Sequence, residues 1–162
     1  MTVTDSRKVL VMMSCSVDVY DSGGQFVRTF GKGTLEFAWD ITATNDGRVM
    51  VVDLRASCVY IFSEDGDHLN QFKLQGCCSI ATIAFQRASE HVVISSTKVV
   101  KGQPGSVKGL HVEIYTKDGE FVRSTEIHEE GNVYMGGITV TTEGRIVVVL
   151  RDNDGHYKAL VM

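Results

Sequence analysis

The chain has 162 residues, of which 43% are hydrophobic and 22% are charged, a composition typical of a folded globular domain and not of a disordered segment. The formal net charge of −4 lacks the basic excess that most nucleic-acid-binding proteins carry. The apolar run at 9–13 is too short for a secretory signal or a bilayer-spanning helix. We therefore expect one cytoplasmic domain over residues 1–162 that binds neither DNA nor a membrane.

A repeated pattern begins in residues 1–30. "MTVTDSRKVLVMM" reads as a strand, a polar turn and an apolar strand, and "VDVYDSGGQFVRTF" adds two strands around a glycine turn. The second copy, residues 40–72, is the clearest. There the turns Asp46-Gly47 and "EDGD" separate alternating apolar runs, which is the strongest short-range signal for β-hairpins. Each copy therefore predicts a four-stranded antiparallel meander.

A third copy covers residues 83–127 and a fourth covers residues 138–162. The tripeptide Phe-Val-Arg occupies the same slot at 26–28 and 121–123. In the third copy the loop between the second and third strands, from Ser95 to Val112, is expected to be long. The fourth copy predicts three strands, the last near 157–162, so we expect about fifteen strands and no helix.

Repetition with a period of roughly 40 residues predicts a β-propeller, because each sheet is then covered by its neighbour. The expected fold is all-β, with about four four-stranded antiparallel blades, the last incomplete. Such a partial ring would expose apolar faces and an unpaired strand edge. The alternatives are a fragment of a longer chain, a small ring, or a ring completed by oligomerisation, most simply a homodimer.

The residues resemble NHL repeats across nearly the whole chain. "WDITATNDGRVMVVD" with "VYIFSEDGDHLNQF", and "VDVYDSGGQFVRTFGKG", fit that repeat, and "GGITVTTEGRIVVVL" fits its first half. The Pro-x-Gly that precedes the first strand in the family is replaced by Ala38-Trp39-Asp40. The aspartate that ends the second strand in the family is present only as Asp53. WD-repeat propellers are the second interpretation, although the Gly-His and Trp-Asp signatures are absent at the required spacing.

The resemblance extends to the C-terminal NHL domain of tripartite-motif (TRIM-NHL) proteins, which implies recognition of a protein or an RNA. The expected function is that of a non-enzymatic recognition or scaffold module that binds a protein partner. Such a module could be the substrate-recognition part of a ubiquitin-ligase-type protein. Ligase activity itself would need a RING domain, whose Cys/His spacing does not occur in this sequence. The alternative function is a single-stranded RNA-binding propeller.

Function in propellers is expected at the end that carries the fourth-to-first and second-to-third strand loops. Basic and aromatic side chains there could dock a protein or hold RNA by phosphate neutralisation and base stacking. The candidate residues are Lys32, Phe37, Trp39, Arg55, Lys98, Lys101, Lys108, Tyr134 and Arg151. Trp39 has two interpretations, a packing residue between blades or an anchor for a partner. We expect no catalytic residue, metal or cofactor, and free thiols at the four cysteines.

Overall fold

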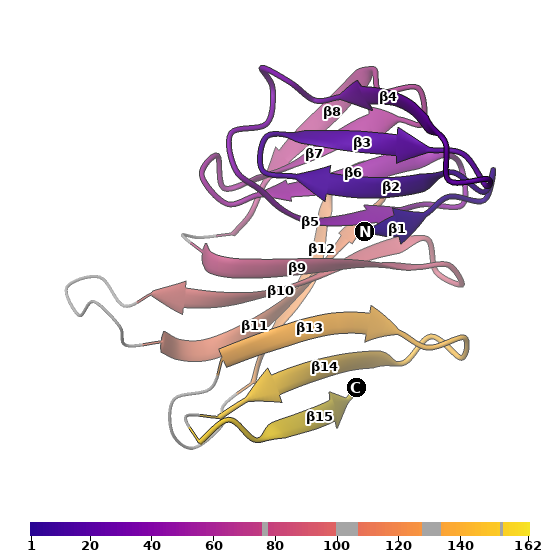
Figure 1. Cartoon of the computed structure of the whole chain (residues 1–162). Helices are drawn as coiled ribbons and strands as arrows, with labels where there is room; N and C mark the ends of the chain where they lie inside the picture. The colour runs from indigo at the N-terminus through magenta and orange to yellow at the C-terminus, as the bar shows by residue number, and fades with distance from the viewer. Residues whose placement is uncertain (76–77, 100–106, 128–133, 153) are drawn as a thin grey trace. The chain divides into compact units, whose positions relative to one another are not determined.

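The computed structural model describes residues 1–75, 78–99, 107–127, 134–152 and 154–162 of the chain. The described residues form fifteen β-strands and no helix, as predicted (Figure 1). The strands are β1 (Thr2–Val3), β2 (Val9–Met13), β3 (Ser16–Tyr20), β4 (Phe26–Phe30), β5 (Ala38–Ala43), β6 (Arg48–Asp53), β7 (Cys58–Ser63), β8 (His68–Lys73), β9 (Cys78–Gln86), β10 (His91–Val99), β11 (Val107–Thr116), β12 (Phe121–Ile127), β13 (Tyr134–Val140), β14 (Ile146–Arg151) and β15 (Tyr157–Val161).

The strands form four antiparallel sheets in which every strand pairs with its neighbour in the sequence. Three sheets have four strands, β1–β4, β5–β8 and β9–β12, and the fourth contains β13, β14 and β15. These are the meander blades of a β-propeller, so the all-β, propeller-type fold expected from the repeats is confirmed. Within the described part of the chain, no helix is long and apolar enough to cross a membrane.

The chain divides into two compact units, Met1–Leu74 and Gln75–Met162, each built from two sheets. In the first unit, one face of β1–β4 and one face of β5–β8 enclose a shared core. Its members are Leu10, Val17, Val19, Phe30, Leu35, Ala38, Ile41, Val49, Val51, Cys58, Tyr60 and Phe62. Apolar residues two positions apart in β2, β3 and β6 point to this core because side chains alternate along a strand.

The second unit has an equivalent core between the sheets β9–β12 and β13–β15. Its buried members are Val93, Leu110, Val112, Ile114, Ile146, Val148 and Leu150. Ile138 and Leu160 pack against it from the flanking strands of the fourth sheet. Whether the two units form the single domain expected for residues 1–162 stays a prediction.

The third sheet differs from expectation. The second-to-third strand loop was expected to run from Ser95 to Val112, but β10 continues to Val99 and β11 starts at Val107. The pairs Thr97↔Leu110 and Val99↔Val107 extend the ladder past the expected loop start. Alternating β-branched residues favour strand here, and pairing satisfies backbone groups that a loop would leave to water. Only residues 100–106 of that segment lie outside the described residues.

A β-bulge recurs between the third and fourth strands of every four-stranded sheet. The register shifts between Val19 and Tyr20, between Ile61 and Phe62, and between Ile114 and Tyr115. The ring just after each bulge contacts the first ring of the next strand, as in Tyr20–Phe26 at 5.8 Å between ring centroids. The repeated bulge shows that the sheets are equivalent position by position, which allows their contacts to be compared directly.

Candidate functional site

Asp53 organises the loops at one end of the first unit. It ends β6, is fully buried, and accepts three backbone hydrogen bonds through its carboxylate. Glu36 N–H and Phe37 N–H donate to Oδ2 at 2.6 and 2.8 Å, and Ala56 N–H donates to Oδ1 at 2.9 Å. One side chain thus holds the connection before β5 and the turn after β6 together. Hydrogen bonds to a charged carboxylate are strong, so Asp53 at the end of β6 fixes the positions of both loops.

Backbone hydrogen bonds join the same loops to the turn between β2 and β3. Ala38 N–H donates to the Ser14 carbonyl at 2.8 Å, and Leu54 N–H donates to the Phe37 carbonyl at 3.1 Å. The Cys15 thiol lies 3.3 Å from the Glu36 carbonyl and donates to it. Hydrogen bonds therefore hold three loops of the first and second sheets together, and these loops form one continuous surface.

Two aromatic side chains project from this surface. Phe37 and Trp39 are each 40% exposed, and their ring centroids lie 6.0 Å apart. They border an open hollow of about 320 Å³ whose other side is formed by the end of β2. The lining residues are Met12, Met13, Ser14, Phe37, Ala38 and Trp39. We call these six residues the Phe37–Trp39 surface.

The Phe37–Trp39 surface is apolar, adaptable and bordered by charge. Met13 is 49% exposed, and an exposed methionine beside aromatic rings suits contact with apolar side chains of varied shape. Lys32 and Arg55 are exposed on the loops fastened by Asp53, and so is Glu36. This end of the first unit therefore carries charges of both signs and is not a basic surface.

The structure brings only some of the predicted residues together. Lys32, Phe37, Trp39 and Arg55 belong to the loop-rich end of the first unit. Arg151 is exposed at the end of β14 in the second unit. Lys101 lies outside the described residues, and Lys98, Lys108 and Tyr134 lie in β10, β11 and β13 with side chains that are not described.

Met12, Met13 and Ser14 were not among the predicted site residues. A signal for them was present, because an apolar pair at the end of β2 directly precedes a second-to-third strand turn. That turn lies at the same end of a meander as the loop before β5. Both methionines also fit the pattern of ordinary strand residues, which hides their place beside the rings.

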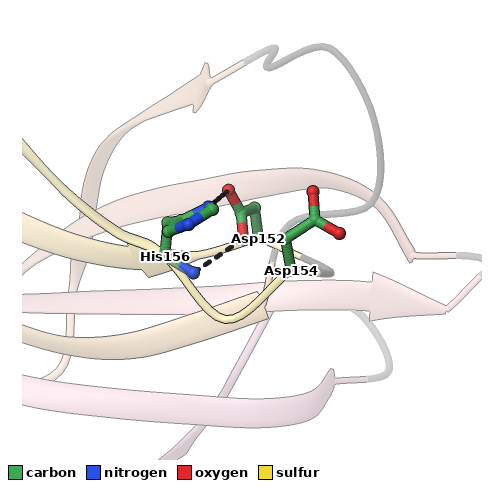
Figure 2. A group of neighbouring side chains, drawn as sticks. All are labelled: Asp152, Asp154 and His156. Carbon is green, nitrogen blue, oxygen red and sulfur yellow. Dashed lines mark hydrogen bonds and ion pairs between the residues drawn. The ribbon is translucent and has the colours of Figure 1, made fainter.

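A second cluster of polar side chains occupies the turn between β14 and β15 (Figure 2). One ligand-type atom from each of Asp152, Asp154 and His156 lies within 4.8 Å of the others. The Asp152 carboxylate accepts the His156 backbone N–H at 2.8 Å and approaches His156 Nδ1 at 3.2 Å. The hydrogen bond from the His156 N–H lowers the pKa of Asp152 below its usual range. These contacts explain the cluster as a turn closed by an aspartate.

Comparisons with known proteins agree with this architecture. No protein-family model matches the chain. A stretch of 61 residues is 38% identical to Protein brain tumor of Drosophila melanogaster, and this stretch is 38% of the chain and 6% of that protein. The solved structure of virginiamycin B lyase from Staphylococcus aureus aligns with 98% of this chain, and the alignment covers 53% of the lyase chain. The TM-score is 0.63 and the sequence identity is 11%. The structure of the WD40 repeats of RRP9 aligns with 99% of this chain, and the alignment covers 49% of the RRP9 chain. The TM-score is 0.63 and the sequence identity is 15%.

The chain spans about half the length of these solved structures and a small part of Protein brain tumor. At such low identity, the structural likenesses establish the propeller fold alone. Brain tumor is a TRIM-NHL protein, and its match to the chain together with the meander sheets confirms the predicted resemblance to an NHL-type domain. The solved relatives include both a lyase and WD40-repeat proteins, so the fold is compatible with scaffold and enzyme functions alike.

Proposed function

We propose that this NHL-like chain is a non-enzymatic recognition module that binds a protein partner through the Phe37–Trp39 surface. The observation that carries the proposal is the pair of exposed rings held beside two methionines by a buried carboxylate. Aromatic anchors on a pre-ordered surface supply most of the binding energy in many interfaces. Ordering the loops in advance also lowers the entropy lost on binding.

The match to Brain tumor supports a finer proposal. The chain would act as the substrate-recognition part of a ubiquitin-ligase-type assembly, with the ligase chemistry supplied by another domain or protein. Cytoplasmic location is part of the same proposal. Cys15 is a free and exposed thiol, a state that a reducing compartment preserves.

The test uses selection from a random-peptide display library against the purified chain. We expect selected peptides to carry apolar anchors and to lose at least about tenfold in affinity for the Phe37→Ala and Trp39→Ala variants. Leu69→Ala is the control, because Leu69 is 53% exposed on β8 and does not line the hollow. Peptides that bind all of these variants equally well would overturn the proposal.

Single-stranded RNA is the competing ligand, since Lys32 and Arg55 share this end with the two rings. RNA binding that weakens steeply with salt and disappears in the Arg55→Glu and Arg151→Glu variants would replace protein recognition by RNA recognition. Absence of any shift with an RNA pool at low salt would remove this alternative.

Self-association is also proposed, most simply as a homodimer. The fourth sheet exposes Tyr157 by 69% and Val161 by 58%, an apolar surface that association would cover. Light scattering should then give twice the chain mass of 17.8 kDa. A single species of 17.8 kDa at high concentration would contradict it.

A further inference from the structure

The third sheet has a longer central hairpin than the second sheet. Strands β10 and β11 contain 9 and 10 residues, whereas β6 and β7 contain 6 each. The last pair between β6 and β7 is Asp53↔Cys58. Counted from the bulge that both sheets share, the equivalent pair in the third sheet is Ser96↔His111. The ladder of the third sheet therefore continues past the point at which the second sheet turns.

The extension is an ordered part of the sheet with a buried base. It contains two further pairs, Thr97↔Leu110 and Val99↔Val107. We call these four residues, with the residues between them on each strand, the β10–β11 arm. Thr97 is 2% exposed and Leu110 is fully buried in the core between the third and fourth sheets. The core thus holds the base of the arm in place.

A β-bulge places two lysines opposite each other in the arm. Between its two pairs, Lys98 of β10 lies opposite Lys108 and Gly109 of β11. The register of β10 with β9 also shifts at Lys98. Like charges at opposite positions weaken a ladder, and bulges often occur beside functional sites. The stability of the sheet therefore does not explain why two lysines occupy these positions.

The sequence around the arm carries positive charge only. Residues 91–112 contain Lys98, Lys101 and Lys108 and no aspartate or glutamate. The whole chain, by contrast, has a formal net charge of −4. A local excess of one sign in a chain of the other sign attracts partners of opposite charge.

Two acids of the same sheet lie close to the arm in register, and both contact other groups. Glu113 Oε2 accepts a hydrogen bond from the Tyr115 hydroxyl at 2.7 Å and is buried. Glu126 Oε1 lies 3.6 Å from His111 Nε2. These contacts give both carboxylates partners other than the lysines of the arm.

We propose that the β10–β11 arm binds an extended acidic segment of a protein partner, with carboxylates of that segment at Lys98 and Lys108. Hydrogen bonds between ammonium and carboxylate groups are stronger than those between neutral groups. A carboxylate between the two lysines also removes their mutual repulsion. Because the base of the arm is anchored, less entropy is lost when the segment binds.

The residue types of the arm favour an acidic protein over a nucleic acid. Residues 91–112 contain neither an arginine nor an aromatic residue. Surfaces that hold single-stranded RNA stack its bases on such side chains. The arm belongs to the second unit and the Phe37–Trp39 surface to the first, so either proposal can fail without the other.

The test uses a short fluorescently labelled peptide in which glutamate and glycine alternate, and the full 162-residue chain. We expect saturable binding by fluorescence anisotropy at low salt, and weaker binding as salt screens the charges. A matched peptide with glutamine in place of glutamate should not bind. Equal binding of the two peptides would overturn the proposal.

Protein variants locate the site. Lys98→Glu combined with Lys108→Glu should lower the affinity for the glutamate peptide at least about tenfold. The control combines Lys73→Glu and Lys158→Glu, which change the net charge equally at exposed positions of β8 and β15. Equal losses in the two double variants would show that net charge alone attracts the peptide, and would overturn the proposal.

Crosslinking tests the same contact in the unaltered protein, so that it does not depend on how a variant folds. A carbodiimide joins a glutamate carboxylate to a lysine amine as an amide and is itself converted to a urea. Peptide mass mapping should find the crosslinks at Lys98 or Lys108. Crosslinks spread evenly over the lysines of the chain would contradict the proposed site.

Single-stranded RNA of the same charge as the glutamate peptide is the final probe. Weaker binding of the RNA than of the peptide supports an acidic protein segment as the occupant. Tighter binding of the RNA, lost when Lys98 and Lys108 are both replaced by glutamate, would overturn the proposal because the occupant would then be a nucleic acid.

Discussion

The Arg28 guanidinium of β4 lies 2.8 Å from Oδ1 of Asp65 in the turn between β7 and β8, which ties the first sheet to the second. Lys8, the residue before β2, approaches both Asp65 and Glu64. Hydrogen bonding to Arg28, with Lys8 nearby, lowers the pKa of Asp65 below its ordinary value of 3.8. Burial opposes a similar change at Glu64, but hydrogen bonds from Ser6, Thr4 and Lys8 lower its pKa below 4.5.

Acid should therefore weaken the first unit. A carboxylate whose pKa is lower in the folded state contributes stability that is complete above its unfolded pKa and is lost as pH falls through its folded pKa. We expect the free energy of unfolding to fall below about pH 4.5. Asp65→Asn should make that fall shallower, as measured by urea unfolding at a series of pH values.

Asp21→Asn is the control for this experiment. Asp21 is an exposed turn residue whose carboxylate accepts the Gly23 and Gln25 N–H groups, and no ion pair to it occurs among the described residues. Superimposable acid profiles for the wild type and Asp65→Asn would show that Arg28 and Lys8 do not stabilise the charged form.

Loss of the Asp53 carboxylate should be costly. Asp53→Ala leaves three backbone N–H groups without their acceptor, and we expect unfolding to become easier by about 2–4 kcal/mol. Asp21→Ala also removes an acceptor of two backbone N–H groups, but in an exposed turn, so its cost should stay below about 1 kcal/mol. Urea unfolding of both variants checks the difference, and equal costs would mean that burial of Asp53 contributes nothing.

Trp39 is the single tryptophan of the chain and offers a direct reporter of the proposed surface. Because the ring is 40% exposed, acrylamide should quench its fluorescence in the folded protein. Binding of a selected peptide should reduce that quenching. In the Phe37→Ala variant, which retains Trp39 but lacks its partner ring, the same peptide concentration should leave the quenching in place. Quenching that a tightly bound peptide leaves unchanged would place the binding site elsewhere.

The described thiols should differ in reactivity. Cys15 is exposed beside the hollow, whereas Cys58 is 4% exposed and burial raises the pKa of its thiol. We expect iodoacetamide to modify Cys15 well before Cys58, with the two sites resolved by peptide mass mapping. An adduct at Cys15 should also hinder peptide binding, because Ser14 lines the hollow. A Cys15→Ser chain treated in the same way should bind normally.

The strands could be predicted from sequence because each meander carries its own turn chemistry. Turns such as Asp46-Gly47, at which Gly47 adopts a φ of +80°, separate the runs that the structure forms as the paired strands β5 and β6. The extension of β10 past Ser95, and of β11 before Val112, was missed because the equivalent strands of the second copy are shorter, which assigned the extra residues to a loop. Pairing of β10 with β9 and with β11 continues beyond those positions.

The site was predicted only in part. Phe37 and Trp39 were predicted because the repeat places them in the connection from a fourth strand to the next first strand, at the loop-rich end. Met12 and Met13 join them only through hydrogen bonds between loops that lie more than twenty residues apart, such as Ala38 N–H to the Ser14 carbonyl.

Each of the strands in the described part of the chain pairs with a strand next to it in the sequence. The contacts within each sheet therefore join residues that are close in sequence. The entropy lost on closing each connection is small, which favours rapid folding of each meander. Pairing between sequence neighbours also means that a sheet can be duplicated, lost or exchanged during evolution without breaking the pairing of any other. What such an event would disturb is the contact between neighbouring sheets, where the Arg28–Asp65 pair lies.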